Sequence, residues 1–187
     1  MKFKIEKDKL WSSADRRDWV QAAYSPADET GAKQTPTSIT IRCSAGALNA
    51  LGQTVYYQQG YIDDGAHFIV GDEGEVVQHA TADVAVKGQP IQDTVIIELI
   101  NPGPLHQDTN GVWRTWWGDT IKHGWIRPDP VLVQGWACCE AKQLHNFMEL
   151  VSALRREYTI DQLEFDDNLG AILDPHVRKI MNKVKFR

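Results

Sequence analysis

The segment Thr94–Ile100 constrains the fold more than any other part of the chain. It reads TVIIELI, so nearly every residue is β-branched or leucine. A short apolar run of this kind suits a strand that is buried on both faces in the middle of a sheet. Glu98 is the one charge in the run, and a carboxylate buried there without a partner would be costly. We therefore expect a central strand whose Glu98 faces either a pocket or a cation.

The segments around this strand predict an α/β fold. Thr37–Cys43 alternates apolar and polar residues, as a strand with one buried face does, and Gly65–Gln78 reads as a hairpin turning at glycines. Apolar residues recur at helical spacing over 47–59, 140–158 and 175–186, and a short strand is expected at 162–165. This order predicts a mixed central β-sheet flanked by helices on both faces.

Two further segments complete a single domain that we expect to span residues 1–187. Residues 1–35 are polar and mixed, and we expect an N-terminal extension with a helix beginning near Ser12 or Ser13. Residues 101–137 contain five of the seven tryptophans and show little regular pattern, which predicts a long Trp-rich insertion.

Composition narrows the possible partners. Hydrophobic residues make up 42% and charged residues 24% of the chain, as in ordinary globular proteins, and the net charge of −5 argues against a nucleic-acid binder. The sequence has no apolar run long enough for a transmembrane helix, and its charged start is unlike a signal peptide. We therefore expect no membrane partner and a cytoplasmic protein, with release to the cell wall or a virion still open. Cys43, Cys138 and Cys139 predict small buried residues rather than disulfides.

Three segments in a fixed order resemble the N-acetylmuramoyl-L-alanine amidases, whose fold is shared by the peptidoglycan recognition proteins. ITIRCSAG at 39–46 resembles the strand that ends in a zinc histidine. AHFIVGDEGEVVQ at 66–78 resembles the strand and turn that follow it, and TVIIELINPGPL at 94–105 resembles the central strand. WRTWWG at 113–118 resembles an insertion in a bacterial and phage branch. The resemblance implies an enzyme that cleaves the muramoyl–L-alanine amide with zinc held by two histidines and a carboxylate or thiolate.

The resemblance also identifies departures from the zinc site. Arg42 stands where the first zinc histidine is expected, Asp166 where the second is expected, and Asp174 matches the third ligand. Arginine cannot ligate a metal, because its guanidinium stays protonated. Glu98 falls where the family keeps its candidate proton-transfer acid. Ala66 and Val86 replace a tyrosine and a histidine of the family's pocket. We therefore predict no metal site and no cofactor, or zinc if the chain is an active amidase.

Each predicted site residue has a functional and a structural interpretation. The predicted ligand-binding residues are Arg42, His67, Glu98, Trp117, Asp166 and Asp174. No catalytic residue is predicted unless the chain is active, in which case it is Glu98. Arg42 is either a ligand clamp or part of an internal ion pair with the aspartates, and His67 is either a ligand contact or a satisfied histidine on a sheet face. Trp117 either stacks on a ligand or pins its loop to the domain.

Three functions are compatible with these patterns. The first is a catalytically degenerate amidase-fold protein that binds a muropeptide or another anionic small molecule in the former active-site groove. The second is an active N-acetylmuramoyl-L-alanine amidase that hydrolyses peptidoglycan. The third is an inhibitor or structural protein that binds another protein, with residues 101–137 as its contact surface.

Overall fold

The structure of the protein is a computed structural model. It describes residues 1–15, 17, 20–24, 29–46, 49–59, 65–89, 93–121, 126–129, 134–137 and 139–165.

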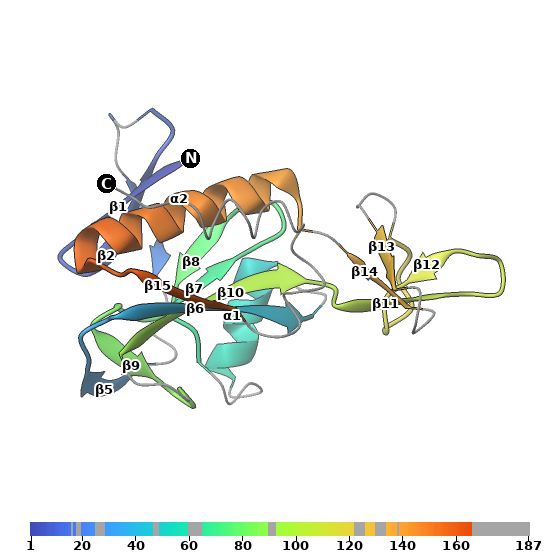
Figure 1. Ribbon diagram of the computed structural model, residues 1–187, viewed down its shortest axis with the longest axis horizontal. Helices are drawn as coiled ribbons and strands as arrows, with labels where there is room; N and C mark the ends of the chain where they lie inside the picture. Colours follow the sequence, from blue (N-terminus) through green and yellow to red (C-terminus); the bar gives the residue numbers. More distant parts are fainter. Residues whose placement is uncertain are drawn as a thin grey trace.

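A six-stranded mixed sheet forms the centre of the protein (Figure 1). Its strands lie in the order β15-β6-β10-β7-β8-β4 and have the bounds Gln162–Phe165, Ser38–Ala45, Thr94–Asn101, Phe68–Val70, Val76–Gln78 and Ala23–Tyr24. The strands β15, β6, β10 and β7 are parallel, whereas β7 pairs with β8 in an antiparallel hairpin. All eight residues of β10 are buried, which confirms the predicted central strand. The mixed sheet and the predicted hairpin are confirmed as well.

One face of this sheet packs against the helix α2 (Ala141–Tyr158) (Figure 1). The helix ends at Thr159, which adopts a left-handed conformation, as residues after helix ends commonly do. Alternate residues of the strands point to this face and meet one stripe of the helix, because side chains alternate along a strand and recur every three to four residues along a helix. The main members of this core are Ile39, Ile41, Phe68, Val70, Val95, Ile97, Leu99, Phe147, Leu150, Val151 and Leu154.

The opposite face is divided into an apolar half and a polar half. The helix α1 (Ala50–Gln58) contributes Ala50 to a second apolar cluster over β10, β7 and β8, with Ala66, Ile69, Val77, Ala80, Val86, Ile96 and Ile100. On β6 and β15 the same face carries Thr40, Arg42, Ser44 and Glu164. The helices predicted at 47–59 and 140–158 are therefore present, and the one predicted at 175–186 lies outside the described residues. No helix among the described residues is long and apolar enough to cross a membrane.

The N-terminal segment is built from strands, so the helix predicted near Ser12 is wrong. β1 (Lys2–Glu6) and β2 (Lys9–Ser13) form an antiparallel hairpin, and β3 (Val20–Gln21) pairs with β2. Lys7 and Asp8 both have positive φ, as the two central residues of a tight hairpin turn do. The apolar residues of β1 and β2 alternate and pack with the α2 core. Apolar residues that alternate with a period of two are typical of strands. This pattern outweighs the helix start that the serines suggested.

The rest of the predicted extension pairs with distant segments. The strand β4 adds to the edge of the central sheet beside β8, and β5 (Glu29–Lys33) pairs with β9 (Val84–Val86) in a separate two-stranded ribbon. The first 33 residues therefore contribute to three sheets of the structure.

Residues 101–137, in which the sequence showed little regular pattern, contain a separate four-stranded sheet. Its strands are β11 (Pro104–Gln107), β12 (Trp113–Arg114), β13 (Ile126–Asp129) and β14 (Gln134–Ala137), in the order β12-β11-β14-β13. Figure 1 shows this sheet set apart from the central sheet, and we call it the projecting sheet. The buried Asn101 side chain donates to the carbonyl of Ala137 over 2.9 Å and so joins the two ends of the excursion. Strands of two to four residues are too short to show a period, which explains why sequence patterning missed them.

Candidate functional site

Two charged residues that the sequence singled out, Arg42 and Glu98, lie on the central sheet, in the polar half of the face opposite α2. Because β6 and β10 are parallel and Arg42 lies opposite Glu98 in the register, both side chains leave the sheet on the same face. The alternation in β6 places Thr40 and Ser44 on that face too, and Glu164 of β15 lies opposite Thr40. We call Thr40, Arg42, Ser44, Glu98 and Glu164 the polar strip.

An ion pair between Arg42 and Glu98 lies at the centre of the polar strip. The Nε of Arg42 donates to Oε2 of Glu98 over 3.0 Å, and the Arg42 side chain is 18% exposed while that of Glu98 is only 5% exposed. The second oxygen of the carboxylate, Oε1, accepts from Nε2 of Gln53 over 3.0 Å. Gln53 is a buried residue of α1. A carboxylate buried in an apolar strand thus receives a charged and a neutral donor, which is how such burial becomes tolerable.

The hydroxyl groups of the polar strip differ in whether they have hydrogen-bond partners. The Thr40 hydroxyl lies 3.1 Å from that of Thr94 and 3.5 Å from Oε2 of Glu164. In contrast, the buried Oγ of Ser44, two residues beyond Arg42, makes no hydrogen bond with any residue that the structure describes. Buried hydroxyls nearly always have a partner, so an unsatisfied one calls for an explanation.

The structure places His67 beneath the surface of the protein. His67 is completely buried, and its Nδ1 accepts from the backbone N–H of Ile96 over 2.9 Å. This bond puts the proton of a neutral ring on Nε2, which donates to the carbonyl of Val84 over 2.9 Å. The two ring nitrogens therefore link the backbone of Ile96 to that of Val84, which favours the structural interpretation of this histidine. Its predicted role in ligand binding stays a prediction.

Trp117 belongs to the projecting sheet rather than to the polar strip. It follows β12 and is partly exposed, and its Nε1 donates to Oδ2 of Asp119 over 2.8 Å. Its ring meets that of Trp116 edge to face, with the centroids 5.2 Å apart. The two predicted aspartates, Asp166 and Asp174, lie outside the described residues, so their place beside Arg42 stays a prediction.

Sequence reasoning missed three residues that the structure brings to this site. Gln53, Ser44 and Thr40 are ordinary polar residues that carry no motif signal on their own. For Ser44 and Thr40 a signal existed, because the alternation of TSITIRCSA puts them on the same face as Arg42. For Gln53 the signal was weaker, because the sequence shows only a polar residue within an expected helix. Ala66 and Val86, where the resemblance led us to expect a tyrosine and a histidine, are buried in the apolar cluster next to α1.

Within the described part of the chain, no group of three or more histidine, cysteine, aspartate or glutamate side chains is arranged to hold a metal ion. The groups at the centre of the polar strip are instead an arginine, a glutamate and an amide.

Comparisons with known proteins give the fold. The sequence matches no protein-family model, and no curated protein is similar to it in sequence. Among solved structures, a mutant endolysin from Bacillus subtilis matches 88% of this chain and 94% of its own with a TM-score of 0.51 at 17% identity. The N-acetylmuramoyl-L-alanine amidase LysCS from Clostridium intestinale matches 80% of this chain and 85% of its own, with a TM-score of 0.47 at 12% identity. The Drosophila peptidoglycan recognition protein SD matches 77% of this chain and 78% of its own, with a TM-score of 0.43 at 12% identity.

The match to the endolysin therefore gives this chain an endolysin-like α/β fold, which agrees with the fold that the sequence motifs predicted. Identities this low define a fold and leave the activity to be argued from the residues of the site.

Proposed function

We propose that the protein is a non-hydrolytic member of this fold that binds a muropeptide, or another anionic small molecule, at the polar strip. The observation that carries the proposal is the ion pair between Arg42 and Glu98 at the position where the resemblance expects a zinc ligand and a proton-transfer acid. A muropeptide offers amides and carboxylates. The polar strip offers matching donors and acceptors on one face of the central sheet.

The donor chemistry of the described residues argues against a zinc ion here. The guanidinium of Arg42 has no lone pair to give and stays charged, so it would repel a cation in the same place. Both oxygens of Glu98 already accept hydrogen bonds, from Arg42 and from Gln53. The same two bonds hold Glu98 as a fixed carboxylate rather than as a base open to a substrate. We therefore derive no hydrolytic step for this site.

The unsatisfied hydroxyl of Ser44 supports a binding role. It lies on the same face as Arg42 and is buried, yet no described residue satisfies it. An amide or carboxylate of a bound ligand would supply the missing partner, and hydrogen bonds of this kind contribute about 1 kcal/mol each. Arg42 would add the charge that favours a carboxylate, because its planar fork suits that group.

The test measures binding and metal content on the same preparation. Isothermal titration with a purified muramoyl tripeptide should show binding to the wild-type protein and at least a several-fold weaker affinity for Ser44→Ala. Arg42→Lys keeps a charge opposite Glu98 but loses the fork, and we expect a larger loss of affinity from it. Leu51→Ala, which removes an exposed side chain on the outer side of α1, is the matched control and should bind normally.

Two results would overturn the proposal. One is a stoichiometric, chelator-removable zinc ion in protein purified without added metal, together with cleavage of the muramoyl–L-alanine amide. The other is unchanged muropeptide affinity in both Ser44→Ala and Arg42→Lys, provided that circular dichroism shows both variants to be folded.

A further inference from the structure

The polar strip continues past Ser44 to a position that has no side chain. Because side chains alternate along a strand, Gly46 follows Arg42 and Ser44 on the same face of the sheet. The N–H of Gly46 donates to the carbonyl of Asn101 over 3.2 Å, so its backbone is still held against β10. Gly46 is not among the described glycines that have a positive φ, so its conformation does not require a glycine. What the glycine provides is therefore the absence of a side chain at this end of the polar strip.

Two polar atoms lie around the place where a side chain of Gly46 would begin. A Cβ atom on Gly46 would lie 3.5 Å from Oε1 of Gln53 and 3.9 Å from Oγ of Ser44. These are ordinary van der Waals distances, so a methyl group would fit beside both atoms without displacing them. The fold thus brings an amide oxygen of α1 and a hydroxyl of β6 close to one point. We call Ser44, Gly46 and Gln53 the Gly46 subsite.

The hydrogen bond to Glu98 fixes which end of the Gln53 amide faces the Gly46 subsite. A carboxylate only accepts hydrogen bonds, so the group that lies 3.0 Å from Oε1 of Glu98 is the NH2 group of Gln53. The amide oxygen is consequently the atom beside Gly46. Gln53 is 6% exposed, and its Oε1 accepts no hydrogen bond from any residue that the structure describes. The subsite therefore contains an oriented acceptor on a buried side chain.

The two unsatisfied oxygens of the Gly46 subsite favour a particular chemical group. The amide oxygen of Gln53 can only accept, so a carboxylate or phosphate oxygen next to it would be repelled. The buried Oγ of Ser44, which makes no hydrogen bond within the described part of the chain, can donate as well as accept. A secondary amide carries an N–H and a carbonyl on adjacent atoms and would satisfy both oxygens. Because buried polar groups without partners are costly, a ligand that supplies both bonds is favoured.

We propose that the Gly46 subsite recognises one secondary amide of the ligand, whose N–H donates to Oε1 of Gln53 and whose carbonyl accepts from Oγ of Ser44. This inference rests on the proposed muropeptide binding at the polar strip, and it names the group that makes this binding selective. Gln53 then has two roles, because its NH2 group supports Glu98 while its oxygen contacts the ligand. A site built to pair with an N–H rejects a ligand that lacks it, since the buried acceptor is then left unpaired.

The test compares the muramoyl tripeptide with analogues in which one amide at a time is replaced by an ester. An ester keeps the carbonyl and loses the N–H. Isothermal titration of the wild-type protein should identify one analogue that binds about tenfold more weakly than the tripeptide, or weaker still. The other analogues should bind much as the tripeptide does. We call the dissociation constant of the weak analogue, divided by that of the tripeptide, the selectivity ratio.

Three variants and a control assign the selectivity ratio to residues. Gln53→Met keeps a side chain of similar length without an acceptor, so the ratio should fall toward one. Ser44→Ala should weaken both ligands and leave the ratio high, because both carry the carbonyl. Gly46→Ala adds a methyl group where the amide would lie, so it should weaken both ligands several-fold without lowering the midpoint of thermal unfolding. Leu51→Ala, on an exposed position of α1, should change neither the dissociation constants nor the ratio.

The selectivity ratio separates ligand recognition from a purely structural role of Gln53. If Gln53 only supports Glu98, Gln53→Met weakens both ligands equally and the ratio stays high, which overturns the inference. Normal tripeptide affinity in folded Gly46→Ala also overturns it, and this variant decides the matter if Gln53→Met does not fold. A ratio near one for every analogue in the wild type overturns the inference alone and indicates a subsite that holds only water. A tripeptide that does not bind the wild type at all overturns the proposed function together with the inference.

Discussion

The polar strip and the projecting sheet organise an arginine and a carboxylate in opposite ways. Arg42 and Glu98 are 56 positions apart and meet only when two parallel strands align, and the Glu98 residue is 4% exposed. Arg114 and Asp108 are six positions apart and meet at the surface of a short antiparallel sheet. The first pair depends on the whole fold, whereas the second depends on its own two turns. We therefore expect the first to affect global stability and the second to affect local order.

The largest effect is expected from breaking the buried pair on one side. Glu98→Ala removes the carboxylate that accepts from Nε of Arg42, whose side chain is largely buried. Breaking such a pair costs about 3–5 kcal/mol of unfolding free energy. Urea unfolding followed by circular dichroism would measure this loss.

The double variant Arg42→Leu with Glu98→Leu is the matched control. Replacing both members of a buried pair by apolar residues is often neutral or stabilising, so this variant should recover most of the stability that Glu98→Ala loses. Equal destabilisation in the single and the double variant would show that the pairing itself is not what stabilises this part of the sheet.

A smaller effect is expected at the second oxygen of the same carboxylate. Gln53→Ala removes the amide that donates to Oε1 of Glu98 from α1. Losing a buried hydrogen bond to a charged group should cost about 1.5–3 kcal/mol. Leu51→Ala, on an exposed position of the same helix, gives the control for helix propensity. If both variants unfold at the same urea concentration, α1 is not coupled to Glu98 through this bond.

The contrast between the two regions also explains what the sequence could predict. The strands β6 and β10 and the helix α2 have long, consistent periods, and their positions follow from local patterns alone. The pairing of Arg42 with Glu98 does not follow from local patterns, because the sequence of neither segment shows how two parallel strands align. Sequence reasoning paired Arg42 with Asp166 and Asp174, which lie outside the described residues, so that pairing stays a prediction. The projecting sheet was missed for the reverse reason: its strands are local but too short to carry a period.

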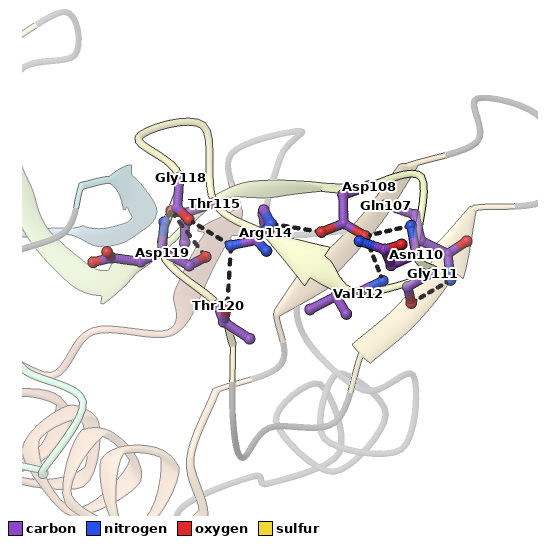
Figure 2. A network of polar contacts seen from close by, with 10 residues as sticks. All are labelled: Gln107, Asp108, Asn110, Gly111, Val112, Arg114, Thr115, Gly118, Asp119 and Thr120. Carbon is purple, nitrogen blue, oxygen red and sulfur yellow. Dashed lines mark hydrogen bonds and ion pairs between the residues drawn. The ribbon is translucent and has the colours of Figure 1, made fainter.

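The third expected effect is local rather than global. Arg114→Ala removes a network at the surface, which Figure 2 shows, and isolated surface pairs contribute little to the unfolding free energy. The midpoint of urea unfolding should therefore hardly move. Hydrogen exchange of the Gly118 and Asp119 amides should nevertheless accelerate, because these groups belong to the turn that Arg114 fixes. A large fall in global stability without faster exchange would contradict the independence of the two regions.

The smallest effect is expected from acid, and it too separates the two regions. The backbone N–H of Val112 and, after it, the Arg114 side chain hold the pKa of the Asp108 carboxyl below its usual range. A carboxyl with a lowered pKa stabilises the folded turn above the ordinary value of about 4, and this contribution is lost as the pH falls through the lowered value. Exchange of the Val112 and Asn110 amides should therefore stay slow at pH 5, after correction for the intrinsic rate, and lose protection only below about pH 4. Asp108→Asn keeps an oxygen acceptor but has no charge to titrate, so its exchange should show no acid transition. If the variant shows the same transition as the wild type, the acid response comes from elsewhere in the fold and the projecting sheet is not an independent unit.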